Sequence, residues 1–333
     1  MMKANDFAIR DGKLHVHYIG HGDPQKSDSF VMDYNGAYYL IDGGMHTADD
    51  SLRYLLDLRA GLLADHPELI ENTDCKLHIT SMASHCHVDH IGALFALIFP
   101  SPYIAVDTFY LPPASQMDPH YNLKDSNGDV KYRPRLAQAL SDYQPQARVI
   151  THEFGAENRF SFRMIAEDES SPLITVCPAY LDYGIGEKME HLVNIYCDGD
   201  RDDHKIAILA VNNCSDWFHI RHGKRTFLFT GDTTKKLPTP HEEMAGEMAD
   251  VYLPILGSVD VIKYVHHGYA RDAAAPDMMR FEPQYVVISA DIGTGGKVIR
   301  RLFPDSPVKL VHSGSQTYIF TTDGESLTVS PEL

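Results

Sequence analysis

The stretch His85-Cys86-His87-Val88-Asp89-His90 places three imidazoles and one carboxylate within six consecutive positions. A largely apolar run precedes it at 77–80 and another follows at 91–98, so we expect folding to hold the polar side chains at their junction. His85 and His87 are two residues apart and project to the same side of an extended loop, whereas Asp89 and His90 fall where a helical pattern begins. This arrangement suits two adjacent metal ions better than one. Zn²⁺, Mn²⁺ and Fe²⁺ all accept imidazole nitrogen and carboxylate oxygen, and zinc is the expected ion.

A histidine-rich surface loop is the alternative interpretation of this stretch. The chain has 19 histidines among 333 residues, so isolated pairs are expected by chance. Four ligand-type side chains in six positions, at a junction between a strand and a helix, favour a metal site instead. Cys86 offers a soft ligand or an oxidation-prone thiol, although its intervening position points it away from His85 and His87.

The composition is that of an ordinary globular protein, with 44% hydrophobic and 23% charged residues. We expect a single domain over 1–333. No apolar run approaches the roughly 20 residues that cross a bilayer, and the first residues lack the apolar core of a signal peptide, so we expect a cytoplasmic protein without membrane contact. The net charge of −17 disfavours duplex nucleic acid, which needs a broad basic face. Five widely spaced cysteines form no disulfide framework.

Strand patterns dominate both ends of the chain, and helices are interspersed. Alternating or apolar runs at 14–19, 29–32 and 37–41 predict strands, and Asn35-Gly36 predicts a hairpin between the last two. Further strands are expected at 206–211, 226–230, 261–265, 285–289, 308–311, 317–320 and 326–329. The pattern fits two sheets packed face to face with helices outside. We interpret the polar, loop-rich region at about 110–205 as the surface that shapes a substrate entrance.

Two more ligand-type groups stand at the ends of apolar strands. Asp232 follows the strand pattern at 227–230, and the pair His266-His267 follows the one at 261–265. Taken alone, Asp232 is better explained by a turn or a helix cap, and the histidines are equally well explained by an ordinary loop. A strand end is nevertheless a place from which a side chain projects into a site.

In chain order, Asp42-Gly43-Gly44, the His85–His90 motif, Thr230-Gly231-Asp232 and His266-His267-Gly268 resemble the metallo-β-lactamase superfamily, over nearly the whole chain. Finer features at 18–23, 40–44, 212–215 and 263–268 are similar to one subgroup. That subgroup contains the metallo-hydrolase domain of bacterial DNA-uptake (competence) channel proteins and the teichoic-acid phosphorylcholine esterases.

The resemblance implies a mixed α/β fold, a four-layer αββα sandwich with two divalent metal ions at one edge of its sheets. His85 and His87 would bind the first ion, Asp89, His90 and His266 the second, and Asp232 would bridge them. His266 is preferred to His267 because it directly ends the strand, which leaves His267 facing the substrate or supporting the ligands. Asp42 and Asn213 are expected to support the ligands by hydrogen bonds from outside the coordination sphere.

Two departures from the family pattern affect the expected site. Many superfamily members have a third histidine for the first metal, but the matching stretch here is Asn212-Asn213-Cys214-Ser215. The first site is therefore weaker or more open, unless His120, His191 or His204 fills it. The uptake-channel group also has a histidine near the chain end, where this chain has a glycine-rich segment at 291–297. His312 is a possible substitute, and the glycines form a tight turn or an anion-binding nest.

The expected function is hydrolysis by a metal-bound hydroxide. Two ions about 3.5–4 Å apart hold such a hydroxide at neutral pH, and Asp89 and Asp232 would orient it. His267, or an acid that supports the ligands, would stabilise the substrate oxygen that gains charge or protonate the leaving group. The expected substrate is a phosphodiester or related small anionic ester, either a small molecule or a short single strand. Lactone, thioester or amide hydrolysis, and a non-catalytic metal-binding sensor, remain open. Candidate phosphate-binding cations are Lys263, Arg271, Lys297 and Arg300.

Overall fold

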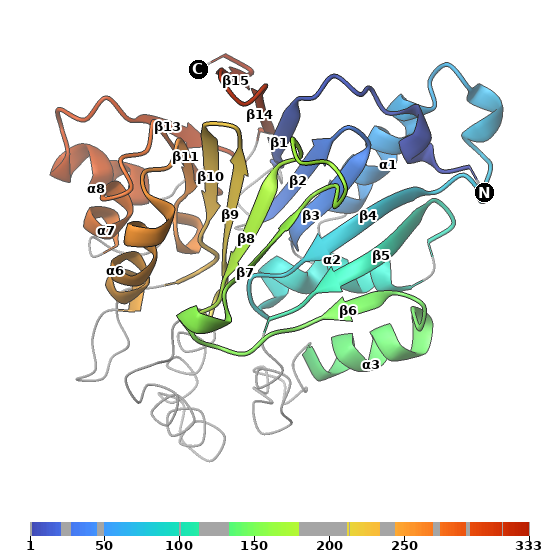
Figure 1. Cartoon of the computed structure of the whole chain (residues 1–333), viewed down its shortest axis with the longest axis horizontal. Coiled ribbons are helices and arrows are strands. Elements are labelled where there is room, and N and C mark those ends of the chain that lie inside the picture. The colour runs from blue at the N-terminus through green and yellow to red at the C-terminus, as the bar shows by residue number, and fades with distance from the viewer. Residues whose placement is uncertain are drawn as a thin grey trace.

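The computed structural model describes most of the chain in eleven stretches. These are residues 2–20, 28–44, 50–99, 101–112, 133–179, 212, 214–233, 244–268, 274–290, 294–314 and 316–332. The described strands form two sheets that pack face to face (Figure 1).

The first sheet has eight described strands. In spatial order they are β15 (Leu327–Ser330), β14 (Tyr318–Thr322), β1 (Leu14–Tyr18), β2 (Ser29–Tyr34), β3 (Ala37–Gly43), β4 (Leu77–Met82), β5 (Ile104–Tyr110) and β6 (Arg148–Ile150). Strands from β15 to β3 pair antiparallel, and strands from β3 to β6 pair parallel. The turn between β2 and β3 has positive φ at Asn35 (49°) and Gly36 (90°), as a type I′ hairpin requires.

The second sheet has seven described strands. In spatial order they are β13 (Lys309–His312), β12 (Tyr285–Ile288), β11 (Val261–Lys263), β10 (Arg225–Phe229), β9 (Trp217–His222), β8 (Leu173–Cys177) and β7 (Phe160–Arg163). Strands β10 to β13 pair parallel and β7 to β10 pair antiparallel. Each sheet therefore has an antiparallel half and a parallel half. The carboxyl ends of the parallel strands lie along one edge of the sheet.

The layer between the sheets is an aromatic-rich core. On β1 the buried side chains of Leu14, Val16 and Tyr18 alternate inward toward the other sheet. The ring of Tyr18 stacks on Phe229 of β10 at 5.7 Å between centroids. Phe30 of β2 lies 4.9 Å from the same ring. Because these contacts join strands of both sheets, the core fixes how the two sheet edges face each other.

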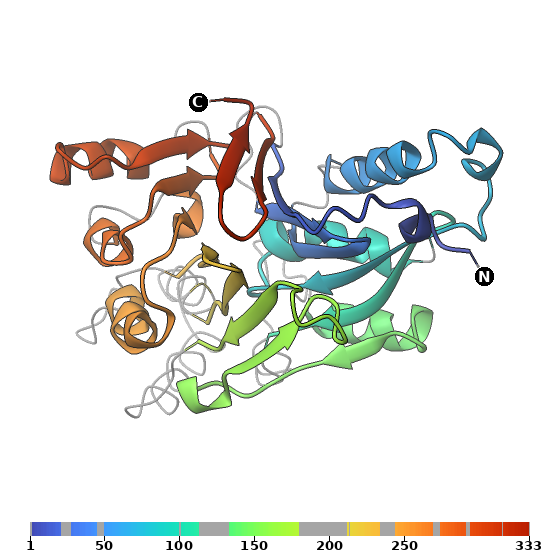
Figure 2. The same ribbon diagram turned by 45° about the horizontal axis from the view of Figure 1, so that its top comes forward.

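Helices cover the outer face of each sheet. On the first sheet these are α1 (Asp50–Leu62), α2 (Val88–Ile98) and α3 (Arg133–Tyr143), whose apolar side chains pack on β3 to β5. On the second they are α6 (Met244–Leu256), α7 (Ala275–Met279) and α8 (Thr294–Leu302). Figures 1 and 2 show α6 to α8 together on the outer side of the second sheet. Short 3₁₀ turns are η1 (Ala4–Phe7), η2 (Pro67–Leu69), η5 (Ala156–Asn158) and η6 (His266–Gly268).

The four layers confirm the expected αββα sandwich. The predicted hairpin at Asn35-Gly36 is present, and the strand expected within 206–211 lies outside the described residues. The region proposed as a substrate entrance is described only in part, through β6 to β8, α3 and η5. In the described part of the chain, no helix is both long and apolar enough to cross a membrane.

We expect Phe229→Ala to destabilise the protein by about 3–5 kcal/mol, because it leaves a cavity beside Tyr18 and Phe30 in the inter-sheet core. The matched control is Phe99→Ala, since Phe99 is 50% exposed at the end of α2; its cost should stay under about 1 kcal/mol. Urea unfolding measures both variants. Equal losses would show that Phe229 does not hold the two sheets together.

Candidate metal centre

The ligand-type side chains meet where the carboxyl ends of parallel strands from both sheets adjoin. Asp42 lies at the end of β3, and the motif 85–90 joins the end of β4 to the start of α2. From the second sheet, Asp232 follows β10 and His267 follows β11. The carboxyl end of parallel strands is the usual place for a site in α/β proteins, because the loops there converge.

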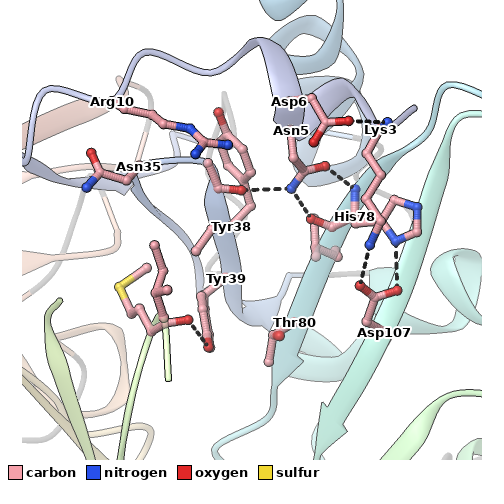
Figure 3. Close-up of a pocket in the computed structure, with 15 residues that line it drawn as sticks. Lys3, Asn5, Asp6, Arg10, Asn35, Tyr38, Tyr39, His78, Thr80 and Asp107 are labelled. Carbon is pink, nitrogen blue, oxygen red and sulfur yellow. Dashed lines mark hydrogen bonds and ion pairs between the residues drawn. The ribbon is translucent and has the colours of Figure 1, made fainter. Parts of the chain in front are cut away.

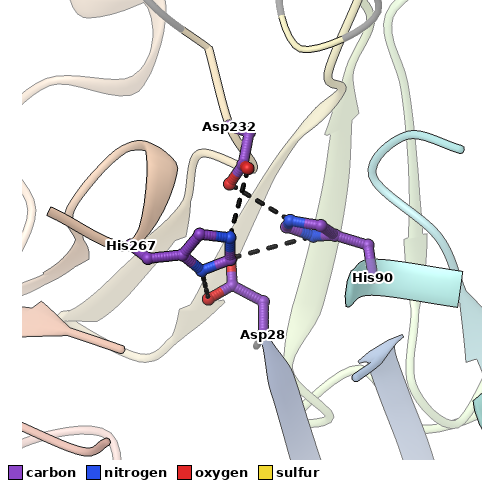
Figure 4. Close-up of side chains that lie close together, drawn as sticks. All are labelled: Asp28, His90, Asp232 and His267. Carbon is purple, nitrogen blue, oxygen red and sulfur yellow. Dashed lines mark hydrogen bonds and ion pairs between the residues drawn. The ribbon is translucent and has the colours of Figure 1, made fainter. Parts of the chain in front are cut away.

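Four buried residues form the centre of this site: Asp28, His90, Asp232 and His267 (Figure 4). Each offers one ligand atom, and these atoms all lie within 4.8 Å of one another. Nε2 of His90 is 3.1 Å from Oδ1 of Asp232, and Nε2 of His267 is 3.2 Å from Oδ2. One carboxylate therefore faces two imidazoles.

Each of these imidazoles has a second carboxylate on its other nitrogen. Nδ1 of His90 is 2.9 Å from Oδ2 of Asp42, and Nδ1 of His267 is 3.1 Å from Oδ1 of Asp28. Asp42 also accepts hydrogen bonds from the backbone N–H and the hydroxyl of Ser84, at 2.7 and 2.9 Å. A carboxylate on Nδ1 fixes the orientation and tautomer of a metal-binding histidine. Both rings therefore present Nε2 to the space around Asp232.

The donor set fits a divalent transition metal. Nε2 of His90 and of His267 are buried and make no hydrogen bond of acceptable geometry, although both face Asp232. Burial disfavours a charge on His90, but Asp232 and Asp42 outweigh it and raise the pKa of His90 to about 10. The same balance, with Asp232 and Asp28 as the anions, raises the pKa of His267 well above its ordinary value. These imidazoles therefore carry protons that a metal ion would replace.

His85, His87 and Asp89 line one side of this cluster. His85 is fully buried; its Nε2 lies 3.2 Å from Nδ1 of His87, and its ring centroid lies 4.1 Å from that of His90. Burial, reinforced by the neighbouring imidazoles His90 and His87, lowers the pKa of His85 well below its ordinary value, so the ring is neutral as a ligand must be. Asp89 places Oδ2 3.3 Å from Nε2 of His267. His90 of the motif thus contacts Asp232 directly, Asp89 contacts His267, and His85 and His87 adjoin His90 in turn.

The backbone conformation after β11 directs the side chains of His266 and His267 to different places. His266 and His267 both have positive φ, 48° and 51°, which is uncommon for residues with a Cβ atom. The turn places His267 in the cluster at 1% exposure, whereas the His266 side chain is 30% exposed and its Nε2 is 3.9 Å from Asp232. The structure thus brings His267 closer to the other ligand atoms than His266, the residue preferred from the sequence.

The stretch that lacks the third histidine supports the site in another way. The hydroxyl of Ser215 accepts a hydrogen bond from the backbone N–H of Asp232 at 3.0 Å. Gly231 has a φ of 52°, and a Cβ there would lie 2.6 Å from the side chain of Ser215, so only glycine fits between these segments. Asn213 lies outside the described residues, as do His120, His191 and His204.

Asp28 was not anticipated from the sequence, although the hairpin register contains a signal for it. Counting outward from the Asn35-Gly36 turn places residue 28 opposite residue 43, and Ser29 does pair with Gly43 through an irregularity in the ladder. The backbone of Asp28 accepts from Gly44 N–H at 2.9 Å and donates to the carbonyl of Asp89 at 3.2 Å. Any residue at this position must therefore lie beside the ligand loop.

A separate cavity of about 390 Å³ lies at the opposite ends of β3 and β4 (Figure 3). Its lining includes Lys3, Arg10, Tyr39, His78 and Asp107 and none of the ligand-type residues above. Asp107 is already engaged there, with Nδ1 of His78 at 2.8 Å and the Lys3 ammonium at 3.6 Å. This cavity is therefore not part of the metal centre.

Two mixed sheets flanked by helices, with His and Asp side chains at one edge, define the metallo-β-lactamase fold. Yeast PDE1, unliganded, aligns with 92% of this chain and 98% of its own at 11% identity and a TM-score of 0.54. Tm1679, a metal-dependent hydrolase of the β-lactamase superfamily, aligns with 91% and 98% at 11% identity and a TM-score of 0.50.

These similarities establish the fold alone, because sequence identity is so low. The metallo-β-lactamase fold protein YhfI from Bacillus subtilis aligns with 93% of this chain and 99% of its own at 10% identity, with a lower TM-score of 0.44. Neither protein-family models nor curated protein sequences match this chain.

The two adjacent histidines provide a direct test of the ligand set. We expect His267→Ala to weaken zinc binding by more than the 10–100-fold typical of losing an outer supporting residue, because its Nε2 faces Asp232 directly. His266→Ala is the matched control and should cost less. Isothermal titration with zinc measures both affinities. A larger loss in His266→Ala would assign the ligand role to His266 instead.

Metal binding at pH 7 should release protons, because the raised pKa values of His90 and His267 keep both imidazoles protonated in the metal-free protein. The affinity should therefore increase as the pH rises toward 10. Titration in buffers of different ionisation enthalpy counts the released protons. Zinc binding with no proton release would show that these two imidazoles are not displaced by the metal.

Proposed function

We propose that the protein is a metal-dependent hydrolase that acts on a phosphodiester or a related small anionic ester. The observation that carries the proposal is the convergence of His90 and His267, through Nε2, on the single carboxylate of Asp232. Each ring is oriented from behind by its own carboxylate. A purely structural site would not need a shared carboxylate with a partly open side.

The charge of the site supports a pair of divalent ions. The carboxylates of Asp28, Asp42, Asp89 and Asp232 lie close together with one ammonium, that of Lys263. In the metal-free protein the protonated imidazoles of His90 and His267 help to balance these carboxylates. Metal binding would remove those protons, and the bound ions would then supply the positive charge that buried carboxylates require. The ring of His85 lies 4.1 Å from that of His90, and His87 contacts His85. In our proposal His85 and His87 would hold a second ion and Asp232 would bridge it to the first, with zinc suited to the nitrogen-rich donors.

Bound divalent ions would lower the pKa of a water molecule from 15.7 toward 7 and stabilise charge developing on the substrate. Asp232 and Asp89 would hold that water and accept its hydrogen bonds. The partly exposed His266 is placed to contact the substrate or the leaving group, whereas His267 is buried. This assignment exchanges the roles expected for these two histidines from the sequence.

The substrate class is argued from charge and accessibility. A net charge of −17 disfavours a duplex and favours a small molecule or a short single strand. Of the candidate phosphate-binding cations, Lys263 is fully buried within the site and Arg271 lies outside the described residues. Lys297 and Arg300 are exposed on α8, which packs beside η6. These two remain available to an anionic substrate.

Motif features also support the subgroup with the DNA-uptake channel and phosphorylcholine esterase proteins. The segment 263–268 supplies Lys263, His266 and His267 to one site, and Asp28 of the same site comes five positions after the segment 18–23 in the sequence. Phosphodiester chemistry is therefore our first candidate.

The test is turnover of bis-para-nitrophenyl phosphate by the zinc- or manganese-loaded protein, beside a panel of esters, lactones and thioesters. We expect phosphodiester turnover that Asp232→Ala abolishes, because Asp232 joins both halves of the site. Asp107→Ala is the matched control in the separate cavity and should retain activity. Turnover of lactones or thioesters alone would replace the substrate class, and full metal loading without any turnover would indicate a sensor.

A further inference from the structure

Lys263 places an ammonium group inside the metal centre. It is the last residue of β11 and is fully buried. Val261, two residues earlier on the strand, packs in the core between the sheets. Because alternate residues of a strand point to the same face, the Lys263 side chain also points between the sheets, toward the cluster. A buried ammonium is costly unless it is paired and hydrogen-bonded. Its contacts therefore reveal what it does.

Three oxygens surround the ammonium. Nζ of Lys263 donates to the carbonyl of Gly231 at 2.6 Å, lies 3.4 Å from Oδ1 of Asp232, and forms a close ion pair with Oδ2 of Asp28. Three acceptor oxygens around Nζ require three N–H donors, which the ammonium form supplies and a neutral amine does not. Lys263 thus holds together the start of β2 and the loop after β10.

Both carboxylate oxygens of Asp28 have partners. Oδ1 accepts a hydrogen bond from the hydroxyl of Ser289 and faces Nδ1 of His267 at 3.1 Å. Oδ2 is paired with Lys263. Asp28 is nevertheless near enough to the ligand atoms of His90, Asp232 and His267 to coordinate the same ion. Something must decide whether it binds the metal or orients His267.

We propose that Lys263 is a positioning residue that keeps Asp28 outside the coordination sphere of the metal. Its fixed positive charge holds Oδ2 away from the metal, so Oδ1 remains the acceptor for Nδ1 of His267. The His267 ring then keeps Nε2 directed at Asp232. Without Lys263, Oδ2 of Asp28 would lose its cationic partner, and that oxygen would turn toward the divalent cation beside it.

This inference rests on the proposed metal centre, and its test separates the two. Cobalt replaces zinc in such sites, and its visible absorption bands report the ligand set without any need for turnover. Wild-type protein that binds no cobalt would overturn the metal centre itself. If wild-type protein binds cobalt, the variants below test Lys263 alone.

We expect Asp28→Asn to leave the cobalt bands unchanged while the affinity falls about 10–100-fold, as for loss of a supporting partner. Lys263→Met should change the bands, because Asp28 enters the coordination sphere. The double variant Lys263→Met/Asp28→Asn should restore the wild-type bands, since no carboxylate remains to move. Lys224→Met, an exposed lysine paired with Glu325, is the matched control and should change nothing.

Three results would overturn the proposal. Changed bands in Asp28→Asn would show that Asp28 is itself a ligand. Unchanged bands in a folded Lys263→Met would show that the ammonium does not position Asp28. If Lys263→Met fails to fold, the double variant decides. Folding of the double variant supports compensation of Asp28, and its failure to fold would show that Lys263 serves the fold through Gly231 and Asp232 instead.

Discussion

The carboxylate of Asp232 joins two imidazoles that come from different sheets. His90 enters from α2, which follows a strand of the first sheet, and His267 follows a strand of the second. These contacts can form only if the two sheet edges meet in one register. The aromatic packing of Tyr18 and Phe30 on Phe229 sets that register, because Phe229 ends the strand that leads to Asp232.

Charge compensation explains why the site is layered. Asp42 and Asp28 lie behind His90 and His267, and Lys263 lies behind Asp28 and Asp232. Each buried charge thus has an opposite or hydrogen-bonding partner, as a low-dielectric site requires. The layers also fix geometry: carboxylates aim the imidazoles, and the lysine fixes one of those carboxylates. Desolvating so many charged groups costs free energy, but the contacts among these groups also hold the site in a fixed geometry.

Much of the fold could be predicted from the sequence because its signals are local. The Asn35-Gly36 turn fixes a hairpin, apolar runs mark the strands, and His85–His90 marks the strand-to-helix junction. The choice between His266 and His267 could not be predicted in this way. Both residues adopt left-handed backbone conformations, and strand alternation does not apply to such a turn.

Sequence patterns also could not predict that Lys263 and Asp28 are buried. Lys263 looks like a surface cation until Asp28 and Asp232, each more than 30 positions away in sequence, are brought to it. Asp28 looks like a loop residue until the hairpin register sets it beside Gly44 and Asp89. Such pairs depend on how the two sheets pack, which no local pattern encodes.

Anomalous X-ray diffraction from crystals of the zinc-loaded protein tests the central role of Asp232 most directly. We expect a zinc peak about 2.0–2.1 Å from Nε2 of both His90 and His267, and about 2.0–2.2 Å from an oxygen of Asp232. A zinc ion bound at another place, with His90 and His267 still in direct contact with Asp232, would contradict the assignment of this cluster as the metal centre.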